Sequence, residues 1–292
     1  MFSYAVITDE VSQDLEDVIR FCGDFALDGI EIRSVWNKPP HQLTEGDIAR
    51  LRDGVGEAGL KVFGIAAPFF KCDIRSDADF DEHLDILRRC INLAQALDTN
   101  LIRVFAFWRQ DPFEDYLDQI VERYQEPIRI AEAEGIILGV ENEHSTMVGT
   151  GRDTRTLVNR LDSPAVKVIW DPCNEFHDSR GDVPFPAGYN HVKDVLAHVH
   201  IKDAVLQPDE GAICVPMGDG EIDFKGQFQA LAADGYSGCI SLETHWRPKP
   251  EQIERQLLDR PGGQAFSELG EEASRICFEN TFKLLNEIGI SR

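Results

Sequence analysis

The stretch VLAHVHIKD (residues 195–203) alternates like a β-strand and places His198, His200 and Lys202 on one face. Similar short runs rich in β-branched residues alternate with amphipathic stretches along nearly the whole chain. The eight runs are YAVIT (4–8), GIEIR (29–33), KVFGIA (61–66), LIRVFAF (101–107), IILGVENE (136–143), VKVIWD (166–171), LAHVHIKD (196–203) and CISLETH (239–245). This alternation predicts parallel strands connected by helices.

Eight strand–helix units favour a (β/α)8 barrel, the TIM barrel, over an open doubly wound sheet. No GxGxxG follows an early strand, so the signature of a dinucleotide-binding sheet is missing. We expect a first helix within 12–27, capped by Ser12, and a closing helix at about 267–290. The prediction is one domain over residues 1–292, with 172–190 and 204–223 as long loops above an active site.

Composition narrows the classes of partner. The chain has 292 residues, 42% of them hydrophobic, and 52 acidic residues against 29 basic ones give a formal charge of −23. Such a surface repels phosphate backbones and anionic headgroups, so we expect neither nucleic acid nor membrane as a partner. The sequence shows no signal peptide and no membrane span, which predicts a cytoplasmic protein. Seven scattered cysteines without CxxC spacing predict neither a disulfide framework nor a structural zinc site.

Four consecutive strands end in residues that can bind a metal ion. Glu141 ends the fifth strand and Asp171 the sixth, and His200 and Glu243 end the next two. The carboxyl ends of barrel strands meet at one rim, where active sites lie. Three carboxylates and one imidazole suit one divalent ion such as Mn²⁺, Mg²⁺, Co²⁺ or Zn²⁺. The alternative is an ordinary salt bridge at each position, but four such residues at one rim favour the metal site.

Several motifs together resemble the sugar phosphate isomerase/epimerase family, the xylose-isomerase-like barrels. They are ENEH (141–144), WDPCN (170–174), HVHIKD (198–203), GDGEIDF (218–224) and SLETHW (241–246), with TDEVSQDLE (8–16) and GIEIRSVW (29–36) near the start. The resemblance implies that Glu141, Asp171, His200 and Glu243 hold one divalent metal ion. It also implies that Glu141 and Glu243 form the acid/base pair. Homo-oligomers, dimers or tetramers, are a further expectation from the resemblance.

The implied activity is that of a metal-dependent sugar or keto-sugar isomerase or epimerase. A divalent ion that holds the ketone oxygen and the neighbouring hydroxyl stabilises an enediolate, while two carboxylates remove and return the carbon-bound proton. Which glutamate is the base stays open.

One departure from the family pattern favours an alternative activity. Epimerases of this family usually carry Asp-x-x-His on strand six, and here Asn174 takes the place of the histidine. An amide cannot exchange a proton at neutral pH. This departure favours a dehydratase or lyase that uses the same site on a keto-sugar, keto-inositol or 3-keto-glycoside.

Two further classes of protein are disfavoured. An apurinic-site endonuclease on this barrel requires a basic groove, which the charge of −23 opposes. A sugar-binding protein without catalysis does not explain why all four ligand positions are filled.

Other polar or aromatic residues near the strand ends are candidates for substrate contacts. They are Lys202, Arg33, Asn174, His177, Arg103, His245 and Trp108. Ion pairs within the barrel or plain packing are the alternative for each of them. No basic cluster or glycine-rich phosphate cradle is evident, so we expect a free or glycosidic sugar rather than a sugar phosphate.

Overall fold

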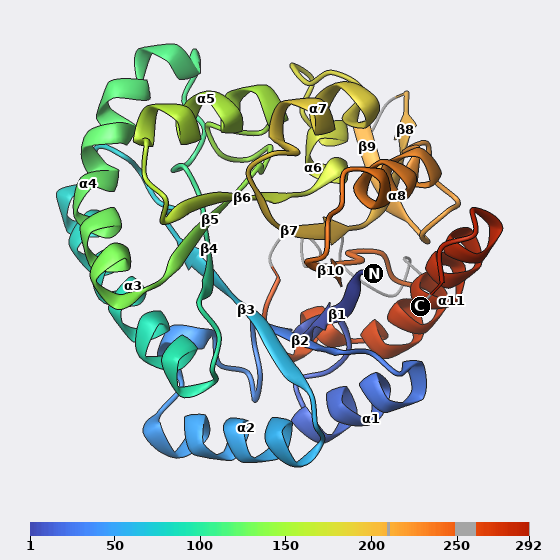
Figure 1. Ribbon diagram of the computed structural model, residues 1–292. Coiled ribbons are helices and arrows are strands. Elements are labelled where there is room, and N and C mark those ends of the chain that lie inside the picture. Colours follow the sequence, from blue (N-terminus) through green and yellow to red (C-terminus); the bar gives the residue numbers. More distant parts are fainter. Residues whose placement is uncertain (209–210, 249–260, 292) are drawn as a thin grey trace.

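Eight parallel strands close into a barrel, as predicted, in a computed structural model of the protein (Figure 1). The structure describes residues 1–208, 211–248 and 261–291. The barrel strands are β1 Ser3–Ile7, β2 Gly29–Ile32, β3 Lys61–Phe69, β4 Leu101–Val104, β5 Ile137–Glu141, β6 Val166–Trp170, β7 Leu196–Ile201 and β10 Cys239–Leu242. Each strand pairs with the barrel strands before and after it in sequence, and β10 closes the barrel against β1.

Helices form an outer layer around the strands (Figure 1). They are α1 Leu15–Phe25, α2 Glu45–Glu57, α3 Asp77–Ala96, α4 Leu117–Glu134, α5 Gly151–Leu161, α6 Pro172–His177, α7 Tyr189–Val192, α8 Phe224–Ala233, α10 Gln264–Ser267 and α11 Gly270–Glu287. Short helical turns are η1 Thr8–Glu10, η2 Pro40–Gln42, η3 Phe113–Asp115 and η4 Pro184–Gly188. No helix among the described residues is long and apolar enough to cross a membrane.

The predicted cap of the first helix is wrong. Asp14 caps α1, and its side chain accepts the backbone N–H of Glu16 at 2.8 Å. Ser12 instead accepts the N–H of Asp14 at 3.0 Å, two residues before the position that caps the helix. Both residue types cap helices well, so local sequence alone did not separate them.

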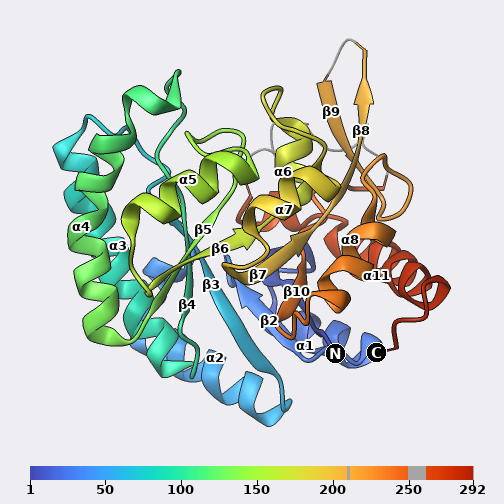
Figure 2. The same cartoon turned by 45° about the horizontal axis from the view of Figure 1, so that its top comes forward.

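The two segments predicted as loops contain regular structure, so that expectation is wrong in part. α6 lies within 172–190 and α7 begins at its end, and β8 Asp203–Gln207, of which all but the first residue falls in 204–223, pairs antiparallel with β9 Gly211–Val215. This hairpin follows β7 directly and extends beyond the barrel on the same side as α6 (Figure 2). A helix of six residues and two half-exposed strands are too short to give a clear periodic signal.

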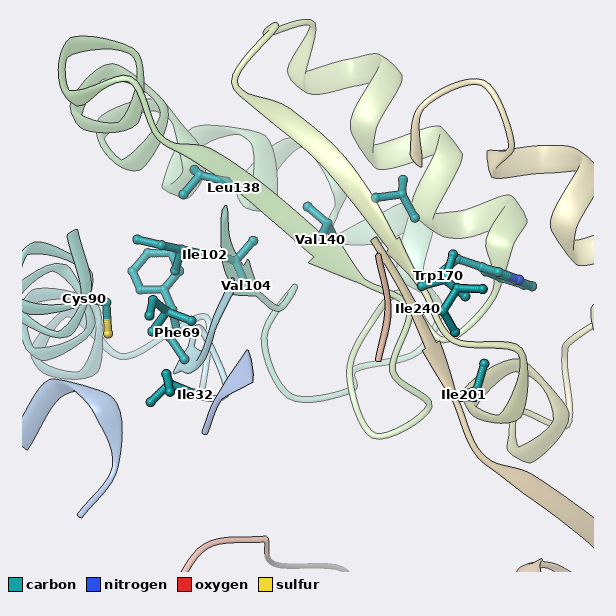
Figure 3. Packing of buried hydrophobic residues seen from close by; sticks show 14 of the residues in the cluster. Ile32, Phe69, Cys90, Ile102, Val104, Leu138, Val140, Trp170, Ile201 and Ile240 are labelled. Carbon is teal, nitrogen blue, oxygen red and sulfur yellow. The ribbon is translucent and has the colours of Figure 1, made fainter. Parts of the chain in front are cut away.

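Alternation along β4 and β5 separates an apolar outer face from inward-pointing charged residues. Ile102 of β4 and Leu138 and Val140 of β5 belong to the hydrophobic core between strands and helices (Figure 3). Because neighbouring residues of a strand point to opposite faces, Arg103 and Glu141 point into the barrel. The outward face therefore provides the core, and the inward face provides the polar groups of the site.

The packing of β2 against β3 leaves no room for a side chain at Gly29. A Cβ there would lie 2.0 Å from the carbonyl oxygen of Lys61. We expect Gly29→Ala to lower the free energy of unfolding by about 1–3 kcal/mol, because the two strands must separate. Urea denaturation followed by circular dichroism measures this change.

Gly56→Ala on α2 is the matched control. A Cβ at Gly56 has no heavy atom within 4 Å. We expect this variant to raise the free energy of unfolding by about 0.5–1 kcal/mol, because alanine loses less backbone entropy in a helix. Equal stability of Gly29→Ala and the wild type would contradict the close approach of the two strands.

Candidate metal centre

The four residues predicted as ligands converge at the carboxyl-terminal rim of the barrel. One ligand atom from each of Glu141, Asp171, His200 and Glu243 lies within 4.8 Å of the others, and all four side chains are buried. Glu141 ends β5, His200 is the last residue but one of β7, and Asp171 and Glu243 directly follow β6 and β10; these strands are neighbours in the barrel. The order of the four residues along the chain is therefore also their order around the rim.

Carboxylates face both ring nitrogens of His200. Nδ1 lies 3.1 Å from Oε1 of Glu141 and 3.6 Å from Oε2 of Glu243, so it faces the cluster. Nε2 lies 3.0 Å from Oε2 of Glu31, and the same oxygen lies 3.1 Å from Nε2 of His198. A metal-binding histidine commonly donates its other N–H to a carboxylate, which fixes the ring. Glu31 is placed to do this for His200.

Lys202 lies between two of the four residues. Its Nζ donates to Oδ2 of Asp171 and, at 2.7 Å, to Oε2 of Glu243. Burial opposes the charge of Lys202, but these carboxylates raise its pKa well above the ordinary value. Burial raises the pKa of Asp171 to about 6. Burial also opposes ionisation of Glu243, yet Lys202 and His245 hold the pKa of Glu243 well below its usual range. Lys202, Asp171 and Glu243 are therefore all charged at neutral pH.

Arg33 connects the cluster to the residues that follow β1. Its guanidinium donates to Oε1 of Glu243, to Oδ1 of Asp9 at 2.9 Å and to Oε1 of Glu10 at 2.7 Å. All of these side chains are buried. Three carboxylates therefore hold Arg33 at the same time. The planar guanidinium group allows this because its N–H donors point in several directions.

Glu141 has one oxygen without a hydrogen bond. Oε1 accepts Nδ2 of Asn174 at 3.1 Å, whereas Oε2 accepts no hydrogen bond from the described residues, although Nη1 of Arg103 lies 3.3 Å away. Buried carboxylate oxygens are rarely left in this state. A divalent cation would satisfy this oxygen, and three carboxylates with one imidazole are a suitable ligand set for it. The residues present therefore fit one divalent metal ion.

Most of the predicted substrate-contact residues lie beside the cluster. Hydrogen bonds or ion pairs join Lys202, Arg33, Arg103, Asn174 and His245 to one or more of the four residues. Two others lie apart. Nδ1 of His177 is 2.8 Å from the carbonyl oxygen of Cys173, and Trp108 is 41% exposed. Among the described residues neither makes a hydrogen bond or ion pair to the cluster, and contact with substrate stays a prediction for all seven.

The strand-end pattern did not single out three buried charged residues, Asp9, Glu10 and Arg247. Nη1 of Arg247 donates to Oε2 of Glu10 at 3.1 Å, and its Nη2 donates to the carbonyl oxygen of Phe266 at 2.8 Å. Asp9 and Glu10 follow β1 just as Glu243 follows β10, and these two strands pair. Their position after a barrel strand was the signal available in the sequence.

Comparison with known proteins agrees with this architecture. Residues 19–260 match the family described as the xylose isomerase-like TIM barrel. An inosose dehydratase of Bacillus licheniformis is 26% identical over 241 residues, which cover 72% of each chain.

Solved structures share the fold. The IOLI protein with a bound zinc atom superposes with a TM-score of 0.77 at 19% identity, covering 98% of this chain and 99% of that chain. The 3-keto-D-glucoside 4-epimerase YcjR from E. coli superposes with a TM-score of 0.70 at 17% identity, covering 98% and 100%.

The contact between Glu31 and His200 generates a test of the metal centre. We expect Glu31→Gln to weaken divalent-metal binding about 10–100-fold, because the ring of His200 loses the charged partner that orients it. Competition with a fluorescent chelator measures the affinity for Mn²⁺ or Zn²⁺. Glu132→Gln removes the same charge from an exposed position on α4 and should leave the affinity unchanged. Equal affinities in both variants would refute a positioning role for Glu31.

Proposed function

The chain belongs to the xylose isomerase-like TIM barrel family, and from its site we propose that it is a divalent-metal-dependent enzyme acting on a keto-sugar or keto-polyol. The proposed first step removes a proton from the carbon beside the carbonyl group. The observation that carries the proposal is the convergence of Glu141, Asp171, His200 and Glu243, with one ligand atom from each within 4.8 Å at a buried rim.

These four residues would hold the metal ion. When bound, the ion supplies a Lewis acid that stabilises the negative charge developing on the substrate oxygens. The protein supplies the base, the hydrogen-bond donors and a buried site. Lys202 and Arg33 hold Glu243 in place beside the ion position.

The two glutamates differ in their suitability as the base. Both oxygens of Glu243 are engaged, Oε1 by Arg33 and Oε2 by Lys202. A carboxylate held by two cations is a weak base. Glu141 is held less closely. Its Oε2, the oxygen that would face the ion, accepts no hydrogen bond from the described residues and lies 3.3 Å from Nη1 of Arg103, and Asn174 orients the side chain through Oε1. We therefore assign the first proton abstraction to Glu141.

Loss of a neighbouring hydroxyl, giving a dehydratase, is the outcome we favour. The similarity to an inosose dehydratase over 72% of the chain supports it. Asn174 gives further support, because an amide in this place cannot return a proton to the substrate at neutral pH.

Isomerisation or epimerisation is the second candidate. Glu141 and Glu243 both reach the cluster, and two carboxylates are what removal and return of a proton require. The two outcomes share the first step and differ in whether water is lost.

An uncharged sugar fits this interior better than a sugar phosphate. Lys202, Arg33 and Arg103 are each paired with carboxylates in the described part of the site. A phosphate group would have to compete for cations that are already neutralised. Formation of a homo-oligomer stays a prediction.

Isotope exchange tests the proposed step. A panel of ketoses, keto-inositols and 3-keto-glycosides is incubated in D₂O with metal-loaded and metal-free protein, and NMR follows deuterium entering the carbon beside the carbonyl. We expect exchange in the loaded protein only. Glu141→Gln should lower its rate by about 10²–10⁴-fold, because the base is removed.

Metal content is measured in parallel, so that loss of the ion is not mistaken for loss of the base. Glu132→Gln serves as the charge-matched control at the surface. A product lighter by one water identifies a dehydratase, and a product of unchanged composition identifies an isomerase or epimerase. Exchange that persists after complete metal removal would overturn the proposal.

A further inference from the structure

A second cluster of metal-binding side chains lies beside the first and shares no residue with it. It consists of Cys173, His177 and Cys214, whose ligand atoms lie within 4.8 Å of one another. Sγ of Cys173 is 3.5 Å from Nδ1 of His177. We propose that these three residues bind a thiophilic transition-metal ion such as Zn²⁺, as a second metal site.

Two elements that are distant in sequence form this cluster. Cys173 and His177 stand four residues apart on α6, so they share one face of the helix. Cys214 lies on β9, opposite Ala204 of β8. Both strands of the hairpin pack against α6, as the placement of these elements in Figure 2 also shows. The cluster therefore lies where the hairpin meets the helix.

The ligand types of the two clusters select different ions. Thiolate sulfur and imidazole nitrogen suit Zn²⁺ or Cu⁺, whereas the carboxylate-rich centre also suits harder ions such as Mn²⁺ and Mg²⁺. Ligand atoms of one tetrahedral zinc ion lie roughly 3.3–3.8 Å apart, given zinc–ligand distances of about 2.0–2.3 Å. The spacing in the structure is within reach of this geometry through small side-chain rotations. Three protein ligands leave the fourth position for water.

His177 has one ring nitrogen directed at the cluster. Its Nδ1 lies 3.5 Å from Sγ of Cys173. In the structure Nδ1 lies 2.8 Å from the carbonyl oxygen of Cys173 and donates to it. Coordination through Nδ1 would shift this proton to Nε2, replacing one hydrogen bond with a metal–nitrogen bond.

The second site would fix the surroundings of the first. The backbone N–H of Cys173 donates to Oδ1 of Asp171 at 2.8 Å. An ion on Cys173 and Cys214 therefore ties the start of α6, and with it Asp171, to the hairpin that follows β7. This inference goes beyond the proposed function and holds whichever sugar is the substrate.

Cobalt titration of the full chain separates the two sites by their spectra. Thiolate ligands give Co²⁺ an intense charge-transfer band in the near ultraviolet, and carboxylate and imidazole ligands do not. In the presence of a non-thiol reductant, we expect the intensity of this band at saturation to correspond to one thiolate-bound Co²⁺ per chain. The band should be lost in Cys173→Ser and in Cys214→Ser.

Two controls should keep the band. Cys90→Ser changes a buried cysteine on α3, remote from the cluster in the chain. Glu141→Gln alters only the first site, so a band that survives there supports the second site even if the proposed function fails.

The proposal is overturned if the wild type shows no charge-transfer band, or if the band persists in Cys214→Ser. A band that depends on Glu141 overturns it as well. Cys214 is only partly buried, so its variant carries the test even if Cys173→Ser does not fold.

Discussion

A carboxylate buried in a protein interior is stable only when cations or hydrogen-bond donors surround it. The interior of this barrel obeys that constraint at two of the buried glutamates of the site. Glu243 is held by Lys202 and Arg33, and Glu31 is held by two histidines. Removing one partner from such a buried pair typically costs about 3–5 kcal/mol, because the other charge is left without compensation. The site residues are therefore also structural residues.

The same charges cross the seam at which the barrel closes. β1 and β10 come from opposite ends of the chain and pair along their length. Above this pairing, Arg33 binds Asp9 and Glu10 on one side and Glu243 on the other, and Arg247 binds Glu10 from beyond β10. Closure of the barrel brings these groups together, and their pairing in turn stabilises the closed form. A substitution at Arg33 or Glu243 is therefore expected to weaken the closure of the barrel as well as to change the site.

The sequence was most informative where one physical rule acts alone. Strand periodicity located the eight barrel strands, and the rule that strand ends meet at one rim placed Glu141, Asp171, His200 and Glu243 together before the structure was known. Pairing between side chains was harder to predict. That Lys202 binds both Asp171 and Glu243 depends on the register between strands, which a single sequence does not contain.

The sequence analysis also missed the cluster of Cys173, His177 and Cys214, because a single sequence does not show which distant segments lie together. Cys173 and Cys214 have no recognisable spacing, because one lies on a helix and the other on a hairpin that the composition of 204–223 did not indicate. Lys202 has a different consequence, which concerns folding. Its ammonium pairs with both Asp171 and Glu243, and Arg33 pairs with Glu243 as well, so we expect the barrel to fold without a bound ion. A divalent ion at the proposed centre would then enter a barrel that is already folded, and the supply of each ion would decide which one is bound.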